Sequence, residues 1–513
     1  MATQTKPIIV SLGGGLVLNK DVFSMQPGEA LQLQNFEPNI SGGYSKILGT
    51  EKYNTNIVPQ VSSSSERVVM SAIFNDVVLA ARGGTIVRGS SGSGSWTSTI
   101  TSLGTPTKNY EFRKFNFDGT EKIVIATGTS NPQILDASFS TTNVNATGTS
   151  NFKFVEIFKN HLFFAGHSSN EQEISFMGPF QTNDFTSNNG GGTIKVDTEI
   201  VGLKVFRENL FIFGKDKIFK LSGTALADFA IAPVTRNIGC LDGGSIQELA
   251  GDVVFLAPDG LRTIAGTARI GDVELGTISK QVQKRIDDIT THNINSLVIR
   301  SKSQYRLFFP TSTSQAEQAA QGLIAVIKTN PATGQLGFEY ADMKQVKVSA
   351  CDSDFISGTE TIVHGGYDGF IYKQETGNEL TRASTTATID SFYRSPDLHM
   401  GDPGIRKKMQ RVIFNYDNTG NVSATFKLVY DFADPNSPQP SSFSLTTGAG
   451  VALYDLAATT YGTAVYDSSG ASLVRQPVEG SGFTVAVRLD DTSTNPPLEL
   501  KGYEMEFIPG DRR

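Results

Sequence analysis

The sequence predicts an all-β fold in which small hairpins repeat along most of the chain and longer strands follow near the C-terminus. Glycine accounts for 51 of the 513 residues, which disfavours a helical bundle. The clearest unit is 206–221: an aromatic and β-branched run at 209–213, a polar turn at 214–216 and a second run at 217–221. This pattern is typical of a β-hairpin with a tight turn.

The same layout returns along the chain with its residues changed. Further copies lie at 74–88, 117–136, 158–176, 249–261, 305–309 and 361–372. Their starts are roughly 40 to 60 residues apart, close to the spacing of about 40 to 50 residues between the blades of a β-propeller. We therefore expect a propeller over residues 59–384. A series of hairpins arranged in stacked sandwiches remains the alternative.

The two ends of the chain differ from the repeats. Residues 1–58 are rich in glycine turns and too few for a core of their own, so they are expected to pack against another part. Period-two strands at 388–393, 410–416, 424–430, 482–488 and 498–507 predict a C-terminal β-sandwich over 385–513. We expect both ends to join in one β-rich platform.

A single helix is expected, at 276–289. There Ile278, Val282, Ile286 and Ile289 recur at steps of four, four and three, which places them on one apolar stripe. The helix is predicted to pack on the side or rim of the propeller.

Charge and cysteine content restrict the cellular setting. The formal net charge is −7, from 44 basic and 51 acidic residues, which argues against tight binding of nucleic acid by the whole surface but not against passage through a channel. Cys240 and Cys351 are the only cysteines, which fits assembly in a reducing compartment. No apolar run approaches the roughly 20 residues of a membrane helix, so no membrane span is expected.

No motif in the sequence predicts catalysis, a metal or a cofactor. The five histidines lack the paired spacing of a zinc site, and no nucleophile elbow is present. Asp118, Asp259 and Asp368 each precede glycine, which turn formation explains without catalysis. We expect a protein that is not an enzyme.

The densest basic cluster lies in the C-terminal part. It consists of Arg406, Lys407, Lys408 and Arg411. These residues are candidates for docking onto an acidic neighbouring ring or for contact with DNA phosphates. The alternative is a solvated loop before a strand.

Three stretches together carry a family resemblance. They are the N-terminal block with 27–30, 35–38 and 42–43; the pair 277–280 and 305–310; and 406–408 followed by the terminal strand 500–507 and 511–513. This arrangement resembles the tail nozzle proteins of short-tailed bacteriophages, also called tail tubular protein B or packaged-DNA stabilisation (tail hub) proteins. The resemblance is one of layout over most of the chain.

The resemblance implies a structural virion protein. Six copies would form a ring around the DNA ejection channel below a tail adaptor ring, retain packaged double-stranded DNA and guide its exit. The location implied is the virion tail, assembled in the host cytoplasm, with tail fibres nearby. This chain is shorter than the larger members, which leaves the fibre attachment open. The alternatives are a glycan-binding or glycan-cleaving propeller acting on the host surface, and a fibre or baseplate adaptor of different symmetry.

Overall fold

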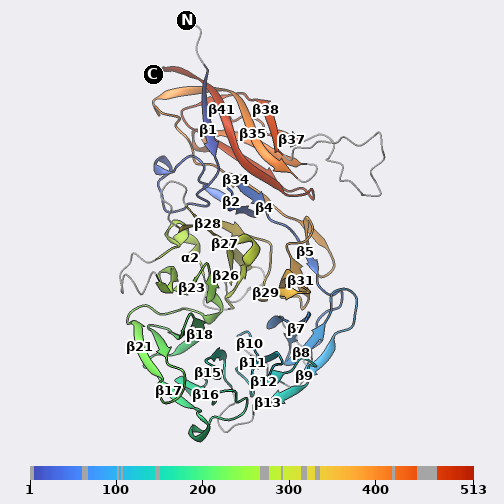
Figure 1. The fold of residues 1–513 in the computed structure, drawn as a ribbon. Helices are drawn as coiled ribbons and strands as arrows, with labels where there is room; N and C mark the ends of the chain where they lie inside the picture. The colour runs from blue at the N-terminus through green and yellow to red at the C-terminus, as the bar shows by residue number, and fades with distance from the viewer. Residues whose placement is uncertain are drawn as a thin grey trace.

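The computed structural model describes most of the chain. The described residues are 5–60, 67–100, 103–104, 108–144, 151–265, 277–289, 293–312, 320–329, 336–418, 422–446 and 471–512. Within them the chain forms a ring of small antiparallel sheets, a β-propeller, and a second β-rich body attached to its rim (Figure 1). The predicted fold class, a propeller with a platform built from both ends of the chain, is confirmed.

Most blades are sheets of strands that follow one another along the chain. They are β6 (Met70–Phe74), β7 (Val77–Arg82), β8 (Thr85–Gly89) and β9 (Thr97–Ile100); β10 (Glu111–Phe115), β11 (Lys122–Ala126), β12 (Gln133–Leu135) and β13 (Thr141–Asn143); β14 (Phe154–Phe158), β15 (His161–His167), β16 (Asn170–Phe176) and β17 (Gly192–Lys195); β18 (Ile200–Phe206), β19 (Asn209–Gly214), β20 (Ile218–Ser222) and β21 (Ala230–Thr235); and β22 (Gln247–Leu249), β23 (Asp252–Ala257) and β24 (Gly260–Thr263).

Two larger sheets complete the ring and continue outward from it. The nine-stranded sheet runs in the order β25 (Asn295–Ile299), β26 (Gln304–Pro310), β27 (Ala320–Thr329), β28 (Leu336–Met343), β2 (Gln32–Gln34), β34 (Ser391–Arg394), β40 (Val485–Asp491), β36 (Ser423–Tyr430) and β37 (Phe443–Thr446). The six-stranded sheet runs β29 (Ala350–Ile356), β30 (Thr359–Gly365), β31 (Ile371–Gln374), β5 (Thr50–Lys52), β32 (Glu379–Thr381) and β33 (Thr386–Thr388).

The hairpin repeat found in the sequence lies on the second and third strands of its blade. Residues 209–213 form most of β19, and β19 pairs with β20 in antiparallel register. Leu210 and Ile212 pack toward the β14–β17 sheet, whereas Phe211 and Phe213 pack toward the β22–β24 sheet. Because successive side chains of a strand point to opposite faces, one apolar run fills the space between blades on both sides.

The start of each repeat is explained by the turn between the first and second strands. Asn75 and Asp76, and likewise Lys159 and Asn160, have positive φ angles in two-residue turns that join β6 to β7 and β14 to β15. Turns of this kind match the twist of the flanking strands and favour asparagine, aspartate and glycine. The local signal was therefore readable from sequence.

The N-terminal segment closes the ring as well as joining the platform. β5 pairs with β31, with Tyr372 opposite Lys52 and Gln374 opposite Thr50. A strand from residues 1–58 thus adds to the blade formed by β29–β31. This contact ties the beginning of the propeller to its end.

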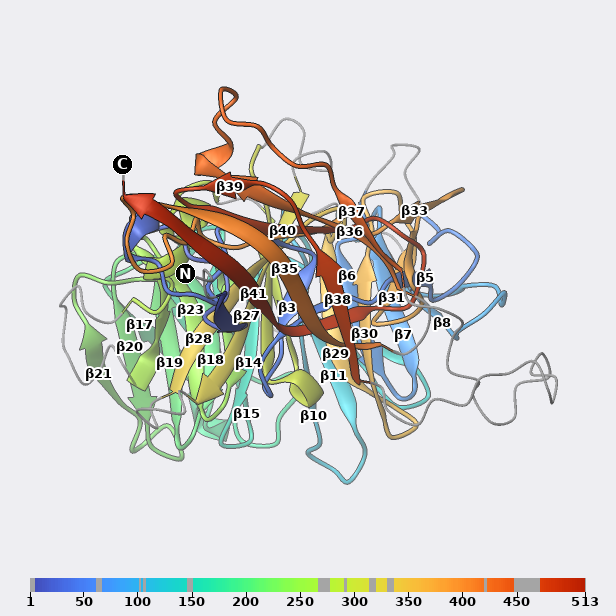
Figure 2. The same cartoon turned by 90° about the horizontal axis from the view of Figure 1, so that it is seen from above.

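The platform is a sandwich of two sheets. Its outer sheet contains β1 (Lys6–Ser11), β3 (Phe36–Pro38), β4 (Tyr44–Lys46), β35 (Ile405–Asn418), β38 (Ala471–Pro477), β39 (Ser481–Gly482) and β41 (Leu498–Arg512). The outer part of the nine-stranded sheet packs beneath it; Phe414 of β35 and Phe426 of β36 lie 4.6 Å apart between ring centroids. Figure 2 shows β35 and β41 running side by side across the platform.

Helical structure is short throughout the described residues. It comprises η1 (Val22–Ser24), η2 (Ser187–Asn189), η3 (Gly243–Ser245), η5 (Lys280–Val282), α2 (Gln283–Ile286), η6 (Arg300–Lys302) and η7 (Asp431–Ala433). The helix expected over 276–289 is much shorter, at 280–286, and residue 276 lies outside the described residues. The predicted stripe is nevertheless real, because Val282 and Ile286 are buried and Ile278 and Ile289 pack against the same core.

Candidate functional site

The basic cluster predicted from sequence lies on strand β35 of the outer platform sheet, not in a loop. Arg406, Lys408 and Arg411 are exposed, whereas Lys407 is buried. Two of the three register irregularities in the ladder of β35 with β41 lie here, between Ile405 and Lys407 and between Met409 and Arg411. β-Bulges of this kind re-aim side chains, and here they leave three of the four cations facing solvent.

The buried side chain of Lys407 is held by two main-chain carbonyl groups. Its ammonium donates hydrogen bonds to the carbonyl oxygens of Asp402 and, at 3.0 Å, Phe483. Burial lowers the pKa of Lys407 because the charged form loses its water. Lys407 therefore holds the turn before β35 and is not available for docking.

The exposed face of the outer sheet carries ordered rows of side chains across four strands. In one row Pro7, Glu506, Arg411 and Pro477 lie side by side on β1, β41, β35 and β38. The next row is Ile9, Glu504, Ile413 and Arg475. Within the first row Arg411 faces Glu506 at 3.7 Å, so part of its charge is compensated in the same chain. The face is mixed in charge, with Arg406 and Lys408 beyond these rows.

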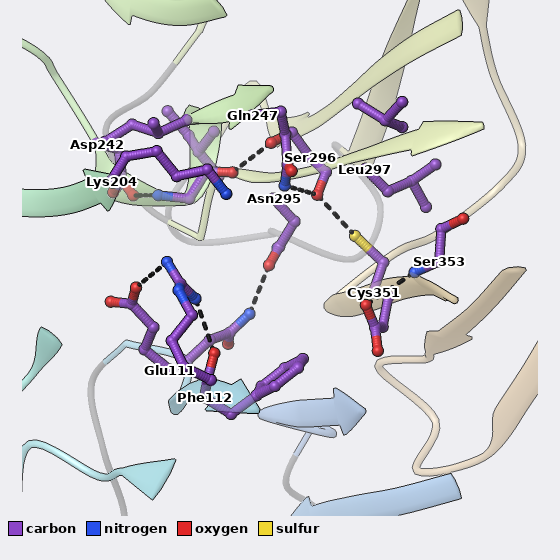
Figure 3. A pocket seen from close by; sticks show the side chains of 18 of the residues that line it. Glu111, Phe112, Lys204, Asp242, Gln247, Asn295, Ser296, Leu297, Cys351 and Ser353 are labelled. Atoms are coloured by element: carbon purple, nitrogen blue, oxygen red, sulfur yellow. Dashed lines mark hydrogen bonds and ion pairs between the residues drawn. The ribbon is translucent and has the colours of Figure 1, made fainter. Parts of the chain in front are cut away.

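A second candidate is the central channel of the propeller. Residues of the innermost strands and the turns beside them enclose a cavity of about 1070 Å³. Figure 3 shows Glu111, Lys204, Asp242, Asn295 and Cys351 directed toward this space from separate strands and turns. The cavity has the volume of a small-molecule site, about 300–1,000 Å³ in typical proteins.

One wall of the cavity holds a charged cluster. Arg113 donates to Glu111 at 2.7 Å and to Glu156 at 2.9 Å. Burial raises the pKa of Glu111 to about 7, although the charge of Arg113 opposes this rise. Lys204 stands in the same cluster. Its pKa is lowered mainly by burial and, to a smaller extent, by repulsion from Arg113. Its ammonium has no hydrogen-bond or ion-pair partner among the residues that the structure describes.

The facing wall comes from β29. Burial raises the pKa of Asp352 to about 6, and the carboxylate accepts a hydrogen bond from the Ile73 amide at 2.8 Å. Burial also raises the pKa of the neighbouring Cys351 thiol, which makes it a poor nucleophile. Lys114 pairs with Asp354 at the same wall. Most charges of the channel are therefore engaged with one another.

Sequence reasoning missed these channel residues. They lie on the innermost strands, just before the hairpins that the sequence marks clearly. Polar residues recur there, as at 108–114 and 351–354, and that recurrence is the signal that could have found them. These side chains come together only when the ring of blades closes, and no local sequence pattern predicts that closure.

The other side chains considered for chemistry have structural partners. Asp118 accepts from Thr120 and Lys122, Asp259 pairs with Arg262, and Asp368 accepts from the Phe370 amide. Each aspartate serves its turn as predicted. Among the described ranges no three histidine, cysteine, aspartate or glutamate side chains are grouped as a metal site would require.

Comparisons with known proteins concern the fold. No family model matches the chain, and no curated protein matches it. Among solved structures it is similar to the WD40 domain of Neurospora crassa Pan2, with 9% identity, a TM-score of 0.38 and coverage of 65% of this chain and 96% of that one. It is also similar to Chaetomium thermophilum Raptor, with 11% identity, a TM-score of 0.38 and coverage of 70% and 30%.

A further similar structure is the extracellular domain of the one-component system BT4673 from Bacteroides thetaiotaomicron. Identity is 8%, the TM-score is 0.39, and the match covers 77% of this chain and 47% of the other. Within the described ranges no helix has the length and apolar character needed to cross a membrane.

Proposed function

We propose that this chain is a tail nozzle protein of a short-tailed bacteriophage, a structural ring component through which packaged DNA leaves the particle. The observation that carries the proposal is the platform. β1 from the N-terminal end pairs along β41 from the C-terminal end, and both belong to a sheet outside the propeller ring (Figure 1). This is the architecture that the resemblance implies.

The size of the channel supports a multi-copy arrangement. A cavity of about 1070 Å³ lined by ion-paired side chains has room for a small molecule, not for a DNA duplex. DNA passage therefore requires a bore between copies, with the platforms making the ring contacts. Heterologous contacts that close give a cyclic ring, and six members are expected from the resemblance.

The charge of the chain suits transient passage of DNA. With a net charge of −7 the surface has little tendency to bind phosphates tightly, which would stall a moving duplex. The exposed cations Arg406 and Lys408 gather on the platform instead. In this proposal they dock onto an acidic face of the tail adaptor ring.

Electron microscopy and mass measurement test the proposal. Concentrated full-length protein should form six-membered rings with an open bore, and antibodies against it should label the tails of virus particles from the host culture. Particles whose label falls on the capsid or on long fibres would contradict the nozzle assignment. So would a closed assembly with no bore between its copies.

A glycan-cleaving propeller is the second candidate, and the raised pKa of Glu111 favours it. A carboxyl group with a pKa of about 7 inside a cavity resembles the general acid of glycosidases. The carboxylate of Glu111 is, however, paired with Arg113 at 2.7 Å, and a structural role for Glu111 explains this ion pair. Release of oligosaccharide from host polysaccharide, lost in Glu111→Gln, would establish this candidate; we expect no release.

A further inference from the structure

Two of the edge strands of the outer platform sheet, β1 and β38, lie on opposite sides of it and run in opposite directions; the short strands β3 and β39 are further edges beside them. β1 pairs only with β41, and β38 pairs only with β35 among the residues that the structure describes. The order β1, β41, β35, β38 is antiparallel at every step. A second sheet placed end to end in the same orientation would therefore meet the first through an antiparallel pair, the pairing with the better hydrogen-bond geometry.

Both edges expose a large apolar side chain, although each also carries a proline and a charge, Pro7 with Lys6 on β1 and Pro477 with Arg475 on β38. Ile9 on β1 is 73% exposed, and Leu473 on β38 is 67% exposed. Natural edge strands usually carry charges, bulges or covering loops at such positions, because an open apolar edge pairs with other chains. Large apolar side chains on both edges indicate that each edge is covered in the assembled protein.

The charges beside the two edges are complementary and unused. Glu504 on β41 and Arg475 on β38 make no hydrogen bond or ion pair within the described part of the chain. Both stand in the row that contains Ile9. If the rows of one sheet continue into the next, Arg475 of one copy lies opposite Ile9 of the neighbouring copy. Glu504 of that neighbouring copy is then two strands away from Arg475, a distance of roughly 9.5 Å.

This spacing suits the two side chains. The aliphatic stem of arginine covers apolar surface while its guanidinium reaches outward, so Arg475 can lie over Ile9 and pair with Glu504. The same register brings Pro7 and Pro477 together at one end, where missing amide donors interrupt the ladder least.

We propose that the occupant of each edge is the opposite edge of a second copy of this chain, with β1 of one copy adding to β38 of the next. The inference rests on the proposed ring function and names its contact. Because the two edges differ, the contact is heterologous and generates a ring when the rotation between copies closes.

Cross-linking of introduced cysteines tests the pairing at high protein concentration, with the native Cys240 and Cys351 present in every variant and control. Ile9→Cys and Leu473→Cys are prepared as separate full-length variants and mixed with a short bismaleimide, which tolerates a small shift in register. The mixture should give at least tenfold more covalent dimer than either variant alone. Phe355→Cys on the propeller, 49% exposed in the wild type, replaces Leu473→Cys in the matched control mixture.

Charge exchange provides the second readout. Arg475→Glu and Glu504→Arg should each reduce cross-linking at least fivefold, and the double variant should restore it. Self-cross-linking of either single variant as strong as the mixture would overturn the proposal, as would a mixture no better than its control. Six-membered rings without this cross-link would refute only the edge pairing; the cross-link in open filaments without a bore would refute the nozzle function and leave the pairing intact.

Discussion

Replacing Arg306 by methionine tests how the platform is fastened to the propeller. Arg306 on β26 is 1% exposed and donates to Glu37 of β3 at 3.1 Å and to Glu375, just after β31, at 2.6 Å. Glu37 and Glu375 are also nearly buried. One guanidinium thus joins a platform strand to both large sheets of the ring.

The expected loss follows from the charges left behind. In Arg306→Met, Glu37 and Glu375 keep Lys302, which is 31% exposed, as their ion-pair partner, and Glu37 also keeps the hydrogen bond from Gln304 at 3.0 Å. Breaking a buried pair in this way costs about 3–5 kcal/mol, a large share of the 5–15 kcal/mol that typically stabilises a domain. Lys302→Met, the matched control, should lose less because Arg306 still compensates both carboxylates.

Urea unfolding followed by fluorescence measures the loss, and pH supplies a check on its cause. Burial by itself would raise the pKa of Glu375, but Arg306 and Lys302 hold it below its usual value. Without Arg306 the folded-state pKa rises, so the penalty is present above the unfolded-state pKa and disappears as pH falls below it. Adding Glu37→Gln and Glu375→Gln to Arg306→Met should restore stability at pH 7. An unchanged stability of Arg306→Met, or no recovery in the triple variant, would refute this reasoning.

Three further predictions concern the blades, the channel and the platform. Phe211→Glu should abolish soluble expression, because it places an unpaired charge between two blades; normally folded protein would contradict the blade assignment. Glu111→Gln should have the same free energy of unfolding as the wild type at pH 4 and one about 3 kcal/mol higher at pH 8. The wild type loses stability as pH rises from 4.5 to 7, because the folded-state pKa of Glu111 is raised from 4.5 to about 7. Equal melting temperatures of the two proteins at both pH values would refute this. Reversing the exposed cations Arg406, Lys408 and Arg411 to glutamate should leave the circular dichroism spectrum unchanged and reduce docking of rings to tails by at least tenfold in electron micrographs; tails that keep full rings would show that the cluster is only solvated.

The repeating hairpins could be predicted because their information is local. Asn75 and Asp76 specify a turn, and the run at 209–213 specifies a strand that faces two blades. The strands at 410–416 and 424–430 were found for the same reason, and they lie within β35 and β36.

The partners of distant strands could not be predicted in this way. β2 pairs with Asp342 and with 392–394, some 300 residues further along the chain, and no local pattern selects such partners. Lys407 was misjudged for a related reason, because bulges that depend on the pairing of β35 with β41 decide which cation turns inward. The channel residues have alternation in the sequence, but only ring closure brings them together.

The nine-stranded sheet relates the two parts of the molecule mechanically. It begins with β25 at the channel and passes through β28, β2 and β34 to β40 in the platform, so each step is a main-chain ladder and not a flexible linker. Asn35, directly after β2, strengthens the junction by donating to Gln345 and to the Asp390 carbonyl and by accepting from the Lys344 amide. A force on the inner sheet of the platform therefore reaches the channel wall through hydrogen bonds that must break together, and a force on the outer-sheet edges passes first through core contacts such as Phe414 with Phe426. In a ring joined through those edges, neighbouring propellers would keep a fixed orientation about the bore.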